Sequence, residues 1–532
     1  MDVMTDWGVD TVFGMVGHSN LGLADALRRS EENGKLRSFG IRHEGAGAFA
    51  ASAYGKLTGR PAACFSIAGP GATNLLTGLW DAKVDRVPIL ALTGQVQSQV
   101  LGPGAFQEIP TAEAFSAVAE WSQTVVSSEN ASELMALAVK HAVVKRDVAH
   151  IVLPDEMQER PGLDDPPPRP RKGRVSETGI SPQPSELQRA LELLSKAERP
   201  VLVVGNGARP FRDKIVRFAE RHDLPVITTF KAKGLIADDH PLGCGGLGRS
   251  GTRVGSSMMG RSDTLVVLGA SFSNHTGISK KKPTIQVDFD RMMLGKFHPV
   301  DVPLWGEIEQ TLSLLDARME PSKSPGIRTE IADRKQRWRT EKERRAGWLD
   351  RKGAMHPAFL FEVLGRLAPE DAVLPVDVGN NTYAFGHYFE CKAYQDVIMS
   401  GYLGSIGFAL PAALGAWAAC GDSRKVISIS GDGGLGQYLA DFTTAVKYAM
   451  PITHIVFNND ELAKISREQV GGLRPVWETS LVNPDFAAYA ELCGGAGFRA
   501  DRPEDVEEAV GAALAVRSGP FLVEVRVSPR WV

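Results

Sequence analysis

An acidic residue and a pair of amides in this chain are spaced as the ligands of one metal ion could be. Asp432 stands between two glycines directly after the apolar run KVISIS, and Asn458-Asn459 follow the apolar run ITHIVF. The 24 residues from 434 to 457 suffice for one helix and one strand, so the asparagines should return to the same sheet edge beside Asp432. Carboxylate and amide oxygens suit Mg²⁺, which proteins usually share with substrate phosphates. These residues indicate a magnesium site for a diphosphate, with a turn and a loop as the alternative.

The elements that would position these residues alternate along the chain. Short apolar runs such as VDTVFGMVG, VPILALTG, LPVITTF and FLVEVRV read as buried strands, and helical patterns lie between them. This alternation predicts an α/β fold, and 532 residues are enough for about three domains. We expect three doubly wound domains with parallel sheets. The expected division is a first domain at 1–160, a proline-rich linker at 161–184, a central domain at 185–320, a charged linker at 321–352 and a last domain at 353–532.

The composition argues against several classes of protein. A net charge of -3, with 43% hydrophobic and 23% charged residues, is ordinary for a globular enzyme. The chain lacks the excess of positive charge that is typical of nucleic-acid-binding proteins. The five cysteines form no CxxC pair, which favours reduced thiols in a cytoplasmic protein. No apolar run reaches the ~20 residues that span a bilayer, so we expect no stable membrane anchor.

The Gly-Asp-Gly turn followed at this spacing by Asn-Asn resembles the thiamine-diphosphate motif of the enzymes that include pyruvate oxidase, acetolactate synthase and pyruvate decarboxylase. The resemblance covers essentially the whole chain and implies a pyrimidine-binding domain, a central nucleotide-binding-like domain and a diphosphate-binding domain, in that order. It also implies that Mg²⁺ is held by Asp432, Asn459 and the backbone carbonyl of Glu461. The residues implied to lie along the cofactor in this turn are Gly431, Asp432, Gly433 and Gly434.

The first domain should supply a carboxylic acid for the same cofactor. In IRHEGAGAF, Glu44 is expected to end a strand before a helix of small residues. The resemblance implies that it hydrogen-bonds N1′ of the aminopyrimidine and favours the tautomer that takes the thiazolium C2 proton. The alternative is a helix N-terminal charge. Asn74, in GPGATNLLTG, would also contact the cofactor and matches acetolactate synthases. In this family the glutamate and the diphosphate site come from different subunits, which implies a homodimer or homotetramer with its active site at the interface.

Two further stretches resemble cofactor and substrate contacts of the family. In SGYLGSIGFALPAALG, the resemblance implies that Ile406 bends the cofactor and that the Gly404 carbonyl accepts a hydrogen bond from its amino group. Ile406 could otherwise be a core residue at a helix start. In GAFQEIP, Phe106 and Gln107 match a substrate-facing Phe-Gln pair.

Three positions bear on the reaction itself. Glu468 matches an active-site glutamate of pyruvate oxidases, with an exposed helix charge as the alternative. His18 stands where most relatives have glycine, and we expect it to contact the substrate. Lys464 stands where pyruvate oxidases carry an aromatic residue. The expected pocket therefore copies neither pyruvate oxidase nor acetolactate synthase.

The central domain resembles the FAD-binding domain of the pyruvate oxidase group. Its literal GxGxxG begins at Gly243, after DDHPL rather than after a strand, so the dinucleotide fingerprint is not met. The resemblance to the pyruvate oxidase group implies that this glycine-rich stretch forms a loop that lies along FAD. A different nucleotide, or none, is the alternative. The residues implied to contact FAD are Gly205, Gly207, Gly245 and Asp288.

These implications point to an enzyme that uses thiamine diphosphate and Mg²⁺ to decarboxylate a small 2-oxo acid, with pyruvate as the leading substrate. Oxidation of the hydroxyethyl intermediate through FAD is the leading outcome. Transfer of the acyl anion to a second carbonyl, as in acetolactate synthase, is the alternative, and a sulfoacetaldehyde acetyltransferase-type cleavage is another. A non-catalytic homologue would have no reason to keep Glu44, Asp432 and Asn459 together.

Overall fold

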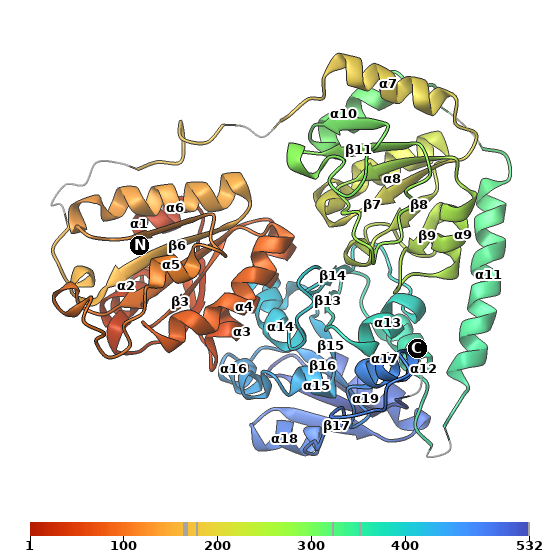
Figure 1. Cartoon of the computed structure of the whole chain (residues 1–532). Helices are drawn as coiled ribbons and strands as arrows, with labels where there is room; N and C mark the ends of the chain where they lie inside the picture. The colour runs from red at the N-terminus through yellow and green to blue at the C-terminus, as the bar shows by residue number, and fades with distance from the viewer. Residues whose placement is uncertain (163–168, 177–178, 322–323, 351–352, 530–532) are drawn as a thin grey trace.

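The computed structural model describes residues 1–162, 169–176, 179–321, 324–350 and 353–529. It contains three α/β units, coloured red to orange, yellow to green, and teal to blue (Figure 1). Part of the expected proline-rich linker, 163–168, lies outside the described residues. The expected charged linker at 321–352 contains the helix α11 (Ile327–Ala346), which runs along one side of the second and third units (Figure 1).

The first unit is a six-stranded sheet with helices on both faces. Its strands have the order β2-β1-β3-β4-β6-β5, and the pairs are parallel. Successive strand residues alternate between two cores, because Phe13 and Cys64 pack with α3 and α4 while Val12 and Ala63 pack with α2 and α6. The elements are β1 (Thr11–Gly14), β2 (Arg37–Gly40), β3 (Ala62–Ser66), β4 (Ile89–Gln95), β5 (Trp121–Thr124), β6 (Val148–Pro154), α1 (Asp2–Asp6), α2 (Leu21–Glu32), α3 (Glu44–Thr58), α4 (Pro70–Asp85), α5 (Thr111–Phe115) and α6 (Ala131–Lys145).

The central unit has the strand order β9-β8-β7-β10-β11-β12. Counted from its first strand this is 3-2-1-4-5-6, the order of dinucleotide-binding sheets, whose ligands lie where the order reverses. The reversal here falls between β7 and β10. The elements are β7 (Pro200–Val204), β8 (Val226–Thr228), β9 (Gly243–Gly246), β10 (Thr264–Leu268), β11 (Thr284–Asp288), β12 (Val302–Trp305), α7 (Pro184–Ser195), α8 (Arg212–His222), α9 (Arg253–Arg261) and α10 (Ile308–Asp316).

The last unit repeats the topology of the first. Parallel bridges from β13 to β15 join a two-stranded and a four-stranded sheet into the order β14-β13-β15-β16-β18-β17. Renumbered from one, both units read 2-1-3-4-6-5. The elements are α12 (Pro357–Leu367), β13 (Val373–Pro375), α13 (Asn380–Tyr388), β14 (Asp396–Ile398), α14 (Ala409–Cys420), β15 (Ile427–Gly431), α15 (Asp432–Leu435), α16 (Phe442–Lys447), β16 (Thr453–Asn458), α17 (Ala463–Gly471), α18 (Phe486–Leu492), β17 (Ala496–Ala500), α19 (Pro503–Ala515) and β18 (Phe521–Arg526).

The predicted fold class, α/β with three parallel doubly wound sheets, is confirmed, and two local expectations are wrong. The strand before Glu44 ends at Gly40, and Glu44 is the first residue of α3. The glycine-rich stretch of the central unit is not a loop over Gly243–Gly246, because these residues form β9, an edge strand of the sheet. Glycine in a strand often marks a close approach of another backbone or an irregularity of pairing. Here a Cβ on Gly243 would lie 2.5 Å from the Ala237 oxygen, and the register between β8 and β9 shifts.

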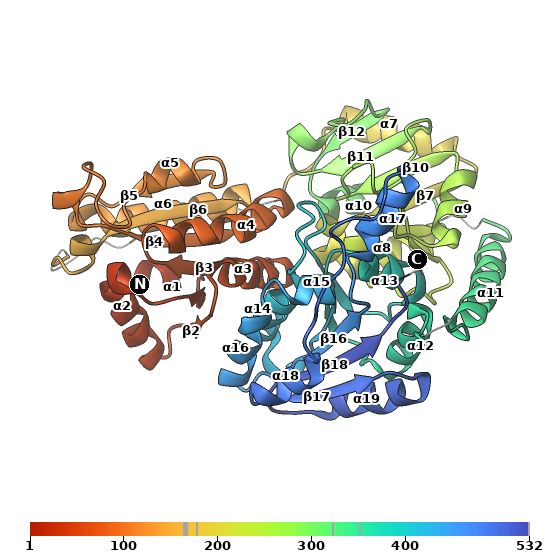
Figure 2. The ribbon, with the colours of Figure 1, turned by 60° about the horizontal axis from the view of Figure 1, so that its bottom comes forward.

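The first and last units meet through α3 and α14, whose residues share one hydrophobic cluster (Figures 1 and 2). Gly415 of α14 lies against the backbone of Ala50, where a Cβ would come within 2.0 Å of the carbonyl oxygen. Beside this contact, Lys56 forms buried ion pairs with Asp81 at 2.6 Å and Asp85 at 2.9 Å. Lys56 also donates to the backbone oxygen of Met399, at 3.0 Å. This lysine therefore ties α3 and α4 to the chain that follows β14.

Replacing Lys56 with methionine should destabilise the fold strongly. The side chain of Lys56 is 4% exposed and those of Asp81 and Asp85 are 0% and 1% exposed. The change takes the cation from the buried carboxylate of Asp81 and leaves Asp85 with Lys231 alone. Breaking a buried pair in this way costs about 3–5 kcal/mol. Thermal unfolding checks this, with Lys35→Met as the control because the pair of Lys35 with Asp2 is exposed. A Tm for Lys56→Met equal to that of the control would contradict the expectation.

Candidate functional site

The carboxylate of Asp432 is the centre of a network of hydrogen bonds at the end of β15. Its Oδ1 accepts a hydrogen bond from the Gly433 N–H at 2.9 Å, and its Oδ2 accepts from the N–H groups of Asn459 at 3.2 Å and Asp460 at 2.8 Å. Burial raises the pKa of this carboxyl, while these donors act in the opposite direction. The predicted return of the asparagines to the side of Asp432 is therefore present in the structure.

The two asparagines have different surroundings. Asn458 ends β16, donates to the buried carboxylate of Glu524 at 2.7 Å and is 3% exposed. Asn459 lies beyond the strand, and its side-chain oxygen accepts from the Glu461 N–H at 3.1 Å. Asp432 and Asn459 thus place a carboxylate and an amide oxygen at one sheet edge, beside the backbone of Glu461. This is the hard-oxygen donor set that Mg²⁺ prefers.

Asn483 is a member of this cluster that the sequence did not reveal. Its Nδ2 lies 2.9 Å from Asp432 Oδ2, 3.2 Å from Asn458 Oδ1 and 3.1 Å from Asp460 Oδ1. It stands in the segment between α17 and α18, 51 residues from Asp432, with no local motif around it. The amide group of Asn483 therefore contacts the carboxylate of Asp432 and an oxygen of each of two residues beside it.

Replacing Asn483 with alanine should weaken Mg²⁺ binding by about 10- to 100-fold, the usual effect of removing a group that orients a ligand. Asp432 would keep its backbone donors but lose the side-chain donor that fixes Oδ2. The Kd for Mg²⁺, titrated in the presence of thiamine diphosphate, measures this. Asn33→Ala, at the exposed end of α2, is the control. Equal affinities in the two variants would remove Asn483 from the site.

Glu44 and Asn74 lie together in the first unit. Asn74 Nδ2 donates to Glu44 Oε2 at 3.0 Å, and Glu44 is 7% exposed. His43 caps α3 by accepting the Gly45 N–H, so the chain enters this helix with Glu44 at its first turn. A Cβ on Gly71 would lie 3.0 Å from Glu44 Oε1, so the start of α4 also borders this carboxylate. Within the described ranges, no hydrogen bond or ion pair joins Glu44 to the Asp432 cluster.

The segment that carries Gly404 and Ile406 connects β14 to α14. Gly404 has a left-handed φ of 76° and donates its N–H to Ser400 at 3.0 Å. Gly404 is exposed and Ile406 is half-buried. Ile406 is therefore not a fully buried core residue, which was the alternative interpretation of this position.

The residues His18, Phe106 and Gln107 gather at the point where the strand order of the first sheet reverses. His18 follows β1 and faces Phe106, with ring centroids 6.4 Å apart. Phe106 is 82% exposed. Gln107 has a left-handed φ of 65°, and its Oε1 is buried without a hydrogen-bond partner among the described residues. Ligands of open α/β sheets bind at such reversal points. The substrate contact expected of these residues stays a prediction.

Glu468 and Lys464 are partners of each other on α17. Their ion pair spans one turn, the side chain of Glu468 is 57% exposed, and the ammonium of Lys464 lies 5.5 Å from the ring centre of Tyr383. The structure does not bring Glu468 into hydrogen-bond contact with the described residues of the Asp432 cluster. The exposed-charge interpretation of Glu468 therefore remains as strong as the active-site one.

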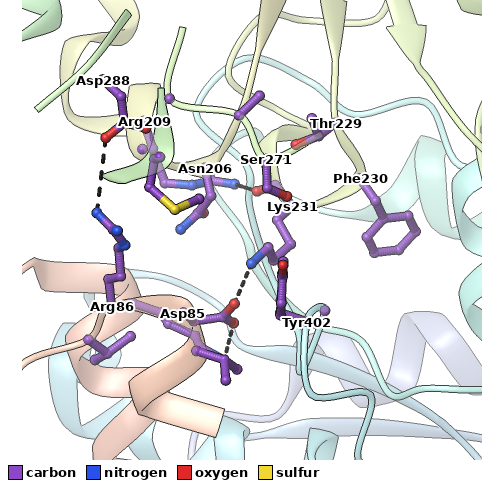
Figure 3. A pocket seen from close by; sticks show the side chains of 18 of the residues that line it. Asp85, Arg86, Asn206, Arg209, Thr229, Phe230, Lys231, Ser271, Asp288 and Tyr402 are labelled. Atoms are coloured by element: carbon purple, nitrogen blue, oxygen red, sulfur yellow. Dashed lines mark hydrogen bonds and ion pairs between the residues drawn. The ribbon is translucent and has the colours of Figure 1, made fainter. Parts of the chain in front are cut away.

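A cleft of about 2200 Å³ lies between the three units (Figure 3). Gly207 follows β7 and Asp288 ends β11, and both line it from the central unit. Asp85 and Arg86 border it from the first unit and Tyr402 from the last (Figure 3). Ion pairs cross it from Arg86 to Asp288 at 4.0 Å and from Lys231 to Asp85. Gly205 lies deeper, since a Cβ there would come within 2.2 Å of the Gly269 oxygen, and Gly245 faces Thr252 from β9.

No group of three or more His, Cys, Asp and Glu side chains in the described part of the chain is arranged to hold a metal ion. The proposed Mg²⁺ ligands are accordingly one carboxylate, one amide and one backbone carbonyl. No described helix is long and apolar enough to cross a membrane.

Three family models match successive parts of the chain. The thiamine pyrophosphate enzyme N-terminal TPP-binding domain matches residues 1–118, the central domain matches 187–315, and the C-terminal TPP-binding domain matches 377–525. Each matched segment falls in one of the three units and holds most of its strands, but the first match ends before β5 and β6 and the last begins after β13. Asp432 and Asn459 lie in the C-terminal match, and Glu44 lies in the N-terminal one.

Several relatives match over nearly the full length. A Bacillus subtilis protein described as thiamine pyrophosphate-containing (YdaP) is 34% identical, over 99% of this chain and 90% of its own. The acetolactate synthase large subunit IlvB1 of Mycobacterium tuberculosis is 30% identical, over 98% and 86%. A pyruvate oxidase of Lactiplantibacillus plantarum is 27% identical, over 99% and 87%. With its three domains matched in order and these sites in place, the chain belongs to the thiamine pyrophosphate enzyme family.

Proposed function

We propose that this enzyme uses thiamine diphosphate and Mg²⁺ to decarboxylate a small 2-oxo acid, with pyruvate as the leading substrate, and that the remaining two-carbon unit is then oxidised. The observation that carries the oxidative outcome is the cleft, which runs from the reversal point of the central sheet to Gly404. A redox nucleotide bound at the reversal point would therefore share one cavity with the segment proposed to hold the thiamine ring.

The residues of the last unit fit the diphosphate and its metal. Asp432, Asn459 and the backbone carbonyl of Glu461 would hold Mg²⁺, and Gly433 and Gly434 let the backbone come close to a diphosphate. Burial raises the pKa of the Asp432 carboxyl, and a bound cation would oppose this effect because it favours the charged form. Asn483 and the main-chain donors orient Asp432 before any metal binds.

Glu44 would move the proton that starts the reaction. Bound thiamine diphosphate supplies a nucleophilic carbon and an electron sink for decarboxylation. Glu44, held by Asn74, would hydrogen-bond N1′ of the pyrimidine, and the Gly404 carbonyl would orient the amino group at the other side of that ring. His18, Phe106 and Gln107 would contact the 2-oxo acid at the reversal point of the first sheet.

The central unit fits FAD. Its strand order is that of dinucleotide-binding sheets, and Gly207 and Gly269 approach each other at the reversal point, where a Cβ on Gly207 would lie 3.2 Å from Gly269. Asp288 ends β11 at the same edge. FAD would accept two electrons from the two-carbon unit. An absorbance band near ~450 nm in the purified protein tests for it.

We propose that two copies of the chain build each active site, in a homodimer or homotetramer. Large apolar side chains at the edges of both cofactor-binding units are exposed in the single chain: Phe106 is 82% exposed, Leu473 96% and Trp477 70%. Exposed apolar surface of this kind marks interaction sites. Co-expression of two inactive variants, Glu44→Gln and Asp432→Ala, tests the proposal. Mixed dimers would hold one intact site and regain about a quarter of wild-type activity, whereas a site within one chain would give none.

Carboligation is the second candidate outcome. It is favoured by the similarity to acetolactate synthases and by Asn74, whose side chain donates a hydrogen bond to Glu44. Incubating the purified protein with pyruvate, thiamine diphosphate and Mg²⁺, while following CO₂, flavin bleaching and acetolactate together, separates the two. CO₂ with flavin bleaching supports oxidation. Acetolactate without flavin reduction would replace oxidation by carboligation.

A further inference from the structure

A buried carboxylate lies between the two cofactor-holding segments of the last unit. Asp377 follows β13, whose neighbour β15 ends in the Gly431–Asp432 turn, so it stands where the strand order of this sheet reverses. Its residue is 0% exposed. Its backbone N–H donates to Ile429 at 2.8 Å, which fixes it against β15. Neither its burial nor its position is visible from the sequence VLPVDVG.

The side chain of Asp377 holds the segment that leads into α14. Its Oδ2 accepts the Gly407 N–H at 3.1 Å, and its Oδ1 accepts the N–H groups of Phe408 at 3.3 Å and Val378 at 2.7 Å. Two of these donors immediately follow Ile406. The carboxylate thus satisfies N–H groups ahead of α14 that would otherwise be buried without acceptors. It also fixes where the Gly404–Ile406 segment ends.

The other side of the same carboxylate touches the diphosphate turn. A Cβ on Gly434 would lie 2.4 Å from Asp377 Oδ2, which is closer than any real contact of that kind. The φ of Gly434 is not left-handed, so the carboxylate, rather than backbone strain, demands glycine there. Asp377 is therefore in contact with the turn and hydrogen-bonded to the segment after Ile406.

A carboxylate is a costly group at this position. Among the described residues, no lysine or arginine forms an ion pair with Asp377, and burial raises its pKa to about 7 against the opposing effect of the backbone donors. Burying an ionisable group without a cation is unfavourable, so packing alone does not account for it. The hydrogen bonds of its two oxygens, to Val378 after β13 and to Gly407 and Phe408 before α14, account for a carboxylate at this position.

We propose that Asp377 is a positioning residue that sets the distance between the Gly431–Gly434 turn and the Gly404–Ile406 segment, so that both ends of bound thiamine diphosphate are held in one geometry. This inference rests on the cofactor contacts proposed above for these segments. It assigns Asp377 no contact with the cofactor; it acts through Gly407 and Gly434.

Asp377→Asn tests the proposal with thiamine diphosphate and Mg²⁺ as the probes. Asparagine has the same shape but only one acceptor oxygen, so either Gly407 or Phe408 loses its partner. We expect the Kd for thiamine diphosphate to rise by about 10-fold or more, and the exchange rate of its C2 proton at saturation to fall by a similar factor. Asp223→Asn, which removes a carboxylate 8% exposed in the central unit, is the control and should leave both values unchanged.

A second pair of variants covers the case in which Asp377→Asn folds poorly. Gly434→Ala should impair both measurements in the wild-type background, because its methyl group meets Oδ2. In an Asp377→Ala background that obstacle is gone, so Gly434→Ala should have a clearly smaller effect there, due only to its methyl group beside the diphosphate. Equal effects of Gly434→Ala in both backgrounds, or wild-type values for a folded Asp377→Asn, would overturn the proposal. Both measurements need no substrate, so failure here is separate from failure of the proposed reaction.

Discussion

Replacing Glu44 with glutamine should lower kcat by about 10²–10⁴-fold while the protein stays folded and binds its cofactor. Glutamine keeps the length of the side chain and an oxygen that can accept from Asn74. It has no ionisable carboxyl to exchange a proton with the pyrimidine, and positioned acid–base groups contribute a factor of this size. Turnover measured at saturating thiamine diphosphate and Mg²⁺, beside the Kd of the cofactor, separates lost chemistry from lost binding.

Glu330→Gln is the matched control for this experiment. Glu330 is also partly buried, with a side chain 20% exposed, but it pairs with Arg199 and Arg261 of the central unit. It should keep wild-type turnover. Near-normal activity of Glu44→Gln would remove Glu44 from the reaction and leave it as a charge at the start of α3.

Replacing Asp432 with alanine should abolish activity by a different route, through loss of the metal and the diphosphate. The change removes the only carboxylate of the proposed ligand set and the acceptor of the donors from Gly433, Asp460 and Asn483. We expect Mg²⁺ affinity to fall by at least about 100-fold. Cofactor retained after gel filtration, measured by fluorescence after oxidation to thiochrome diphosphate, should fall to background.

Asp460→Asn is the control, because Asp460 is the carboxylate next to the same cluster. Its side chain is 45% exposed and pairs with Arg526, so its charge is screened by water. We expect its Mg²⁺ affinity to stay within about fivefold of wild type. Full retention of cofactor by Asp432→Ala would contradict the assignment of the metal site, whatever the activity.

The residues of the site that could be predicted from the sequence are those whose position follows from the order and spacing of neighbouring strands. Asp432 and Asn459 follow consecutive strands of a parallel sheet, and one helix-plus-strand spacing must bring them to the same edge. Glu44 and Asn74 were expected from the resemblance to the thiamine-diphosphate enzymes, and the structure joins them by a hydrogen bond. The roles assigned to these residues stay predictions until the variants are measured.

Asn483 and Asp377 could not be found in this way. Asn483 reaches Asp432 from a segment between two helices, 51 residues away, and Asp377 meets Gly407 across 30 residues. Nothing in the composition of either neighbourhood distinguishes them from ordinary turn residues, and only tertiary packing gives them partners. The end of β2 at Gly40 was missed for a similar reason, since the apolar run continues beyond the last paired residue.

The shared topology of the first and last sheets was also hidden in the sequence. Alternating apolar runs predict parallel strands but not their order. The two sheets share the order 2-1-3-4-6-5, so His18 and Asp377 occupy equivalent points. Each lies a few residues after the first strand of its sheet. At that point His18 is exposed, whereas Asp377 is buried and hydrogen-bonds to the segment before α14.

The most direct test of the proposed function is the release of labelled CO₂ from pyruvate labelled at its carboxyl carbon. Purified protein would be assayed with thiamine diphosphate and Mg²⁺ together, with each alone, and with the Glu44→Gln variant. We expect CO₂ release only when both are present, and a loss of about 10²–10⁴-fold in the variant. Protein that retains thiamine diphosphate and Mg²⁺ yet releases no CO₂ from pyruvate would contradict the proposed reaction.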